Sequence, residues 1–216
     1  MIITKINELG RSMIEMLGVL AIIAVLSVGG IAGYSKAMEK FKINKTIEEY
    51  GYLLQSLIEH LDEYKKANMT FLEMAILVKS LNLVPESYEV SNIWSGLIDS
   101  NNNFISIGFY NFNNARYLQF SVKIGGISKN NDNKAVTAGF SKGVCLSLFN
   151  DLARPLQSEI YRARVYLDNR VNISFYGAKY CGGELKCLQT TTLSEIEQAC
   201  GSCDKNNSAC DVSIDF

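Results

Sequence analysis

The chain has 216 residues, a mass of 24.0 kDa and a mean hydropathy of +0.06, values that favour one folded domain with an additional segment and exclude a disordered chain. The 21 lysine and arginine residues nearly balance the 22 aspartate and glutamate residues, so no basic field indicates a nucleic-acid partner. The single histidine, His60, is expected to be a surface or packing residue rather than a ligand. We therefore expect no catalytic residue, no metal site and no cofactor.

The most apolar part of the chain lies near its N-terminus. Residues 16–33 read MLGVLAIIAVLSVGGIAG and carry no charge. As a helix rising about 1.5 Å per residue, this run is about as long as the hydrocarbon core of a bilayer is thick. A polar segment, MIITKINELG, precedes it at residues 1–10, and one acid, Glu15, lies just inside the apolar stretch.

Three interpretations of this segment treat Glu15 differently. A carboxylate in hydrocarbon is costly, which argues against an ordinary secretory signal peptide. A single-pass anchor could tolerate Glu15 as a residue near the end of its helix. A leader cleaved after Gly10 would leave Arg11 as the new N-terminus, with Glu15 one helical turn behind it.

Residues 10–17, GRSMIEML, followed by the apolar helix, resemble the prepilin cleavage motif of type IV pilins. The resemblance implies that a prepilin peptidase cleaves after Gly10 and methylates the new amine of Arg11. It further implies that Glu15 of one subunit pairs with the Arg11 amine of its neighbour, which would set the register of a filament. Arginine at the new N-terminus fits the type IVb subclass better than the commoner subclass, which has phenylalanine there, although type IVb leaders are usually longer.

Many pilins carry a helix-breaking proline where this chain has Ala32. Gly29, Gly30 and Gly33 flank that position, and glycine costs about 1 kcal/mol relative to alanine inside a helix. The glycines would either loosen the helix locally or permit close packing against another helix. The sequence supports these two roles equally.

An amphipathic stretch is expected to continue the apolar helix to Lys66. A pilin would pack the apolar stripe of this stretch against its own sheet. A dimeric coiled coil is the alternative, although Gly51 interrupts the pattern. The apolar residues recur at intervals of three and four positions: Ile43, Ile47, Tyr50, Leu54, Leu57, Ile58, Leu61 and Tyr64.

The remainder of the chain predicts one α+β unit. Thr70 and Glu73 have the spacing of a capping box before a helix that ends near Leu81, and Thr192 and Glu195 repeat this spacing before a final helix. The other expected elements are a helix over 141–152 ended by Pro155, strands over 104–110, 117–124, 163–167 and 171–176, a polar loop over 128–133 and a turn at 168–170. Six aromatic residues are expected to fill a core rather than to form a binding face: Tyr88, Trp94, Tyr110, Tyr117, Tyr176 and Tyr180.

All six cysteines follow the apolar run and indicate an oxidising compartment. Six cysteines allow 15 pairings, so the sequence does not determine connectivity. Two local pairs are sensible, Cys181 with Cys187 and Cys203 with Cys210, the second across a hairpin turned by residues 206–207. A bridge between the remaining Cys145 and Cys200 would tie the 141–152 helix to the C-terminal segment, and the resemblance to type IVb pilins implies a comparable long-range disulfide.

Two cysteines, in Cys200-Gly-Ser-Cys203, have the spacing of a thiol oxidoreductase motif. Such a site follows a strand and opens a helix, whereas this pair ends a predicted helix and no tryptophan precedes it. A four-cysteine zinc site would have only one pair of suitable spacing. We therefore expect the cysteines to be structural.

The predicted fold is α+β. A long N-terminal helix, membrane-spanning in its first half and amphipathic in its second, packs on an antiparallel sheet, and disulfides hold the C-terminal region. The expected divisions are a leader at 1–10, a transmembrane and filament-core helix at 11–34, an amphipathic helix at 35–66 and a head at 67–216.

The resemblance implies a structural subunit of a type IV pilus-like filament, not an enzyme, that polymerises through its apolar helix. Its partners would be copies of itself, prepilin peptidase and the pilus assembly platform with its ATPase, and it would need no nucleic acid. It would cross the bacterial inner membrane once, with its head in the periplasm, and reach the cell surface as a pilus. The alternatives are a minor pilin or type II secretion pseudopilin and, from another class, a membrane-anchored periplasmic binding or thiol-redox protein.

Overall fold

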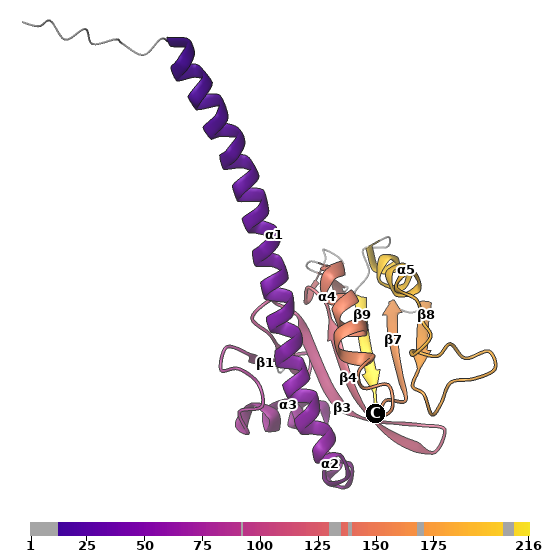
Figure 1. Ribbon diagram of the computed structural model, residues 1–216. Coiled ribbons are helices and arrows are strands. Elements are labelled where there is room, and N and C mark those ends of the chain that lie inside the picture. Colours follow the sequence, from indigo (N-terminus) through magenta and orange to yellow (C-terminus); the bar gives the residue numbers. More distant parts are fainter. Residues whose placement is uncertain (1–12, 92, 130–134, 138–139, 168–170, 205–209) are drawn as a thin grey trace, which may run out of the picture. The chain divides into compact units, whose positions relative to one another are not determined.

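The computed structural model describes residues 13–91, 93–129, 135–137, 140–167, 171–204 and 210–216. The chain divides into two compact units, one ending at Phe41 and the other covering Lys42–Phe216. Helix α1 (Met13–Glu59) contributes to both units. Among the described residues, the second unit holds the other helices and all of the strands (Figure 1).

In the first unit, α1 is an uninterrupted helix from Met13 onward. Gly29, Gly30 and Gly33 lie within it, and no atom outside the local helix backbone comes within 4 Å of the position that a Cβ would take at each of them. The helix is therefore not broken at the place where many pilins have a proline.

The second unit is built around a seven-stranded sheet. Its strand order is β1-β2-β3-β4-β9-β7-β8, and every neighbouring pair is antiparallel. Strands β5 and β6 form a separate two-stranded sheet. The bounds are α2 Leu61–Ala67, α3 Phe71–Ser80, β1 Glu89–Ser91, β2 Gly96–Ile98, β3 Phe104–Phe112, β4 Ala115–Lys123, β5 Ile127–Lys129, β6 Ala135–Thr137, α4 Lys142–Ser147, the π-helix η1 Leu148–Ala153, β7 Arg162–Leu167, β8 Val171–Tyr176, α5 Leu193–Asp204 and β9 Cys210–Asp215.

Strand β9, near the end of the chain, occupies a central place in the sheet. It pairs with β4 on one side, where Ile214 lies opposite Phe120, and with β7 on the other, where Val212 lies opposite Val165. Of the strands in this sheet, β3, β4, β7 and β8 were predicted from the sequence, whereas β1, β2 and β9 were not. The six residues of β9, CDVSID, include two acids, which are depleted in strands, so the local pattern is weak.

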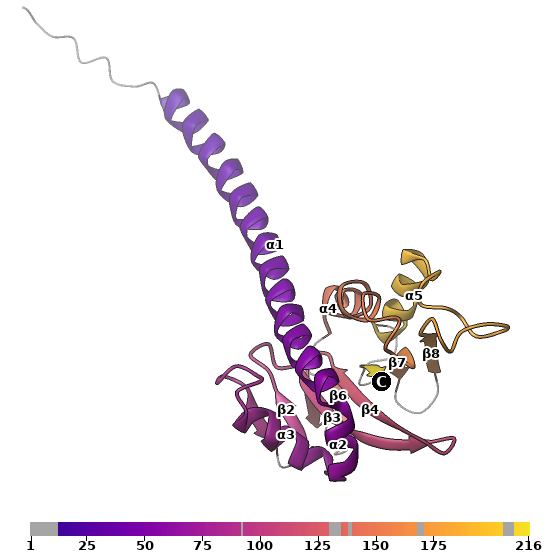
Figure 2. The same cartoon turned by 60° about the horizontal axis from the view of Figure 1, so that its bottom comes forward.

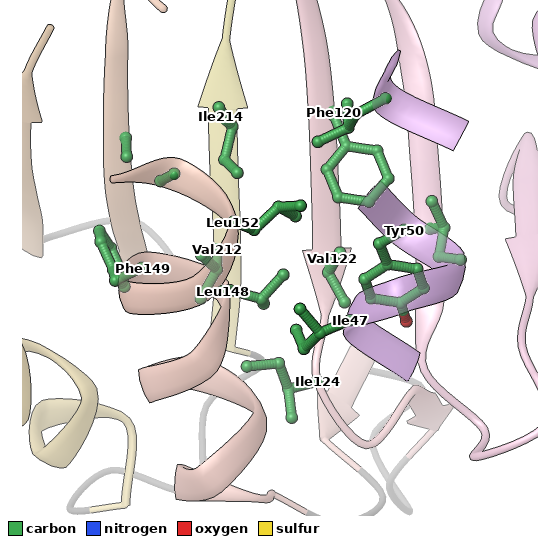
Figure 3. Close-up of a cluster of buried hydrophobic side chains, with 14 of the residues drawn as sticks. Ile47, Tyr50, Phe120, Val122, Ile124, Leu148, Phe149, Leu152, Val212 and Ile214 are labelled. Carbon is green, nitrogen blue, oxygen red and sulfur yellow. The ribbon is translucent and has the colours of Figure 1, made fainter. Parts of the chain in front are cut away.

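One hydrophobic core fills the space between the helices and one face of the sheet. Figure 2 shows the end of α1 and α4 on the same side of the sheet. The apolar stripe of α1 therefore packs on the chain's own sheet, as predicted. Figure 3 shows labelled side chains of this core from α1, η1, β4 and β9, together with Ile124 just after β4: Ile47, Tyr50, Phe120, Val122, Ile124, Leu148, Phe149, Leu152, Val212 and Ile214.

A buried polar contact ties the turn between β2 and β3 to α1. The hydroxyl of Tyr50 donates a hydrogen bond to Oδ2 of Asp99 at 2.6 Å. The other carboxylate oxygen of Asp99 accepts hydrogen bonds from the backbone N–H groups of Asn101 and Asn103 at 2.9 and 2.7 Å. Burial and the Asp99 carboxylate both raise the pKa of Tyr50, so this hydroxyl stays protonated and remains a donor.

The predicted amphipathic helix to Lys66 is two helices. Helix α1 ends at Glu59, His60 separates it from α2, and Asn68 in a left-handed conformation with φ 48° follows α2. Asparagine tolerates this conformation and commonly ends helices. Helix α3 begins with the predicted capping box, in which the Thr70 N–H donates to Glu73 Oε2 at 2.7 Å and the Glu73 N–H donates to Thr70 Oγ1 at 3.2 Å.

Two local predictions are wrong. Residues 128 and 129 belong to β5, paired with β6, because strand pairing uses backbone groups that polar residues also carry. Cys203 and Cys210 do not face each other across a hairpin, because Cys203 lies on α5 and Cys210 begins β9. Residues 130–133 of the predicted loop, residues 206–207 and the predicted turn at 168–170 lie outside the described residues.

Candidate functional site: an exposed apolar helix

The first part of α1 presents a large apolar surface. Ten large apolar side chains on it are 52 to 73% exposed, and its most apolar window of 18 residues has a mean hydropathy of 2.4 with none of it buried. Burying one such side chain is worth about 1.5–3 kcal/mol, so ten of them represent on the order of 15–30 kcal/mol. The helix is long and apolar enough to span a membrane. The ten residues are Met16, Leu17, Val19, Leu20, Ile22, Ile23, Val25, Leu26, Val28 and Ile31.

Glu15 lies in the first turn of α1 and is exposed. The helix dipole favours a negative charge at this end of a helix. A carboxylate at the end of the apolar surface can also reach the membrane interface more easily than one at its centre. Gly10 and Arg11, the two residues of the predicted cleavage site, lie outside the described residues.

The structure pairs all six cysteines in disulfides. Cys145 on α4 is bonded to Cys200 on α5, across 55 positions of sequence. The other bonds are the two local pairs that the spacing favoured, Cys181 with Cys187 and Cys203 with Cys210. Cys200 and Cys203 are both buried and have different partners, so the C-x-x-C sequence does not form one redox-active pair.

A buried charge network joins β9 to β3, β4 and β7. The Asp215 carboxylate, which is fully buried, accepts hydrogen bonds from Arg162 Nε at 2.6 Å, from the Tyr110 hydroxyl at 2.7 Å and from Gln119 Nε2 at 3.2 Å. Burial lowers the pKa of the Arg162 guanidinium, because it disfavours the charged form. The hydrogen bond and the negative charge of Asp215 have the larger combined effect, so the pKa of Arg162 is raised. The sequence pattern did not indicate this network, because its members lie far apart in the chain.

Tyrosine rings extend this network along one end of the sheet. The rings of Tyr117 and Tyr161 are stacked with centroids 4.5 Å apart, and Tyr110 lies 5.8 Å from Tyr117. Tyr161 also contacts Tyr176 and Tyr180 edge to face, at 5.7 and 5.1 Å. Such geometries are favourable for aromatic pairs.

The prediction that six aromatic residues fill a core is wrong for most of them. Tyr88 is fully buried, whereas Trp94 and Tyr180 are exposed and the other three are half-buried. Alternation along the strands explains Tyr117, because Leu118 and Phe120 face the core and Tyr117 therefore faces the other side of the sheet.

An apolar groove lies between α1 and η1. Its volume is about 300 Å³, and its apolar lining comes from Ile58 of α1, Leu152 of η1 and the following Pro155 and Leu156. Gly51 also lines it, and a Cβ at Gly51 would lie 3.6 Å from the Leu152 side chain.

The polar side chains that line this groove include carboxylates from both sides. Glu59 comes from α1, Asp151 comes from η1, and Glu159 follows η1 in the chain. All three are exposed, and none makes an ion pair within the part of the chain that the structure describes. The groove therefore combines an apolar floor with an acidic rim, an arrangement that the spacing of these residues in the sequence did not reveal.

Within the described residues, no group of three or more histidine, cysteine, aspartate or glutamate side chains could hold a metal ion. Neither known protein families, nor curated proteins, nor solved structures gave a match to this chain.

Proposed function

We propose that this protein is a structural subunit of a type IV pilus-like filament, most similar to the type IVb pilins. The observation that carries the proposal is an apolar helix with ten exposed large side chains and an acid in its first described turn. A plain membrane anchor needs the apolar surface but gains nothing from the acid. A helix that polymerises can use both, because the acid can pair with a cation of a neighbouring copy.

Assembly would move the apolar side chains of α1 from lipid into contact with other copies of the helix. Cleavage after Gly10 would create an amine at Arg11, four residues before Glu15. A cationic amine and a carboxylate are each costly in an apolar environment, and pairing them between copies would offset that cost only in the filament. The pair would therefore fix the axial position of one copy against the next.

The disulfides support a head that folds in an oxidising compartment, such as the periplasm. They also weaken the thiol-redox alternative, because Cys200 and Cys203 have different partners. We propose no enzymatic activity for the head.

The intact mass and N-terminal sequence of the membrane-extracted protein test this proposal. The full chain is expressed with and without an active prepilin peptidase and analysed under non-reducing conditions. We expect a chain that begins at Arg11 with one added methyl group only when the peptidase is active, and a mass that lacks six thiol hydrogens. A chain that still begins at Met1 with active peptidase, or that is cut after the apolar run, would contradict the proposal.

A further inference from the structure

The acidic, apolar groove between α1 and η1 defines the chemistry of an occupant that would fit it. Its floor suits an apolar side chain, and Glu59 lies on one wall while Asp151 and Glu159 lie on the other. An apolar group with a cation on each side would therefore satisfy both the floor and the rim.

The chain itself carries such a group, in Lys40-Phe41-Lys42. The Phe41 side chain is 60% exposed, and both lysines are exposed. Successive residues of an α-helix are rotated by about 100°, so Lys40 and Lys42 project to opposite sides of Phe41. Neither lysine makes an ion pair within the described residues.

Phe41 cannot enter the groove of its own chain. One wall of the groove is formed by residues 51–59 of the same helix, α1, that carries Phe41. An uninterrupted helix cannot fold back on itself, so a Lys40-Phe41-Lys42 segment in this groove would have to come from a second copy. The apolar residues 16–31 are a poorer fit, because they carry no cation for the acidic rim.

We infer that the groove receives the Lys40-Phe41-Lys42 segment of a second copy of this chain. The Phe41 ring lies against the apolar floor, and the two lysines reach carboxylates on opposite walls. The inference rests on the proposed filament function, because a filament would bring copies of the chain side by side. It adds a contact between the head of one copy and the helix of the next, outside the apolar segment and Glu15.

Photo-crosslinking in whole cells tests the contact directly. Phe41 is replaced by p-benzoylphenylalanine in the full chain, cells are irradiated, and crosslinked dimers are digested and mapped by mass spectrometry. We expect crosslinks to the peptide that carries residues 151–159. The same probe at Tyr52, which is also 60% exposed on α1 but does not line the groove, is the matched control and should not give them.

Charge reversal tests whether the lysines and carboxylates recognise each other. Lys40→Glu with Lys42→Glu should lower the yield of sheared filaments by about tenfold at equal monomer level, and adding Glu59→Lys, Asp151→Lys and Glu159→Lys, which reverses the acids on both walls, should restore most of it. The matched control is Lys66→Glu with Lys179→Glu, which reverses two exposed lysines elsewhere and should leave the yield near that of the parent.

The outcomes separate this inference from the proposed function. Filaments with crosslinks only outside the two walls of the groove, residues 51–59 and 151–159, or a charge reversal without effect, would overturn the groove contact and leave the filament function intact. Crosslinks to 151–159 in a processed chain that forms no filaments would support docking between copies and overturn the filament function.

Discussion

At the scale of single residues, the Asp215 carboxylate holds together four strands of the sheet. It is fully buried, and the nearby Arg162 side chain is only 9% exposed. Removing one partner of a buried ion pair leaves the other charge without compensation, at a cost of about 3–5 kcal/mol. We therefore expect Asp215→Asn to lower the free energy of unfolding of the head by this amount.

Urea denaturation of the detergent-solubilised full chain, followed through the fluorescence of the single tryptophan, Trp94, measures this loss. Glu184→Gln, which removes an exposed carboxylate near the Cys181–Cys187 disulfide, is the control and should change the midpoint little. A midpoint for Asp215→Asn equal to that of the control would show that the network contributes no stability.

The sequence could not have indicated this network. Tyr110 and Asp215 are separated by 105 positions, and Arg162 and Asp215 by 53. Only the insertion of β9 between β4 and β7 brings these residues together. Glu15 was recognisable for the opposite reason, since a single acid beside a long uncharged run stands out without any knowledge of the fold.

At the scale of elements, the capping box of α5 should make the stability of the head depend on pH. The Glu195 carboxylate accepts a hydrogen bond from the Thr192 N–H at 2.9 Å and one from Lys186 Nζ at 3.0 Å, which lowers its pKa from 4.5 to about 2. A carboxyl group whose pKa is lower in the folded state stabilises it above the unfolded pKa. This contribution is therefore complete above about pH 4.5 and is lost as the pH falls toward 2.

Glu195→Gln should reveal this contribution, because glutamine retains the capping box but does not titrate. We expect the urea midpoint of the parent to exceed that of the variant at pH 6 and the difference to shrink between about pH 4.5 and 2. Glu86→Gln, at an exposed position outside any helix or strand, is measured in parallel as the control. A difference between parent and variant that is independent of pH would contradict the assignment.

Helices and strands could be predicted from the sequence where a few neighbouring residues specify them. Both capping boxes span four residues and were predicted, and α3 and α5 begin where they indicated. The long strands β3 and β4 were also predicted. Residues 128 and 129 of β5 were predicted as loop, and β9 was not predicted at all. Both strands are specified by the strands that pair with them more than by their own side chains.

At the scale of the whole molecule, the disulfides should differ in the stability that they confer. A disulfide stabilises the folded state by lowering the entropy of the unfolded chain. By this effect the Cys145–Cys200 bond, across 55 positions, adds about 4 kcal/mol to the free energy of unfolding, and the Cys181–Cys187 bond, across 6 positions, adds about 2 kcal/mol. We therefore expect Cys145→Ala with Cys200→Ala to destabilise the head about twice as much as Cys181→Ala with Cys187→Ala. Urea midpoints under non-reducing conditions measure both, and equal losses would contradict the expectation.

Glu15 is expected to be required for filament assembly but not for folding of the head. Glu15 belongs to the unit that ends at Phe41, so Glu15→Ala should leave the head folded, with its disulfides intact on a non-reducing gel. In cells with an active peptidase and assembly machinery, we expect the variant to accumulate as a membrane monomer and to form no filaments, because the Arg11 amine would have no carboxylate to meet. Glu48→Ala, an exposed acid further along α1, is the matched control and should assemble normally. Normal filaments from Glu15→Ala would instead favour a membrane anchor in which this acid is incidental.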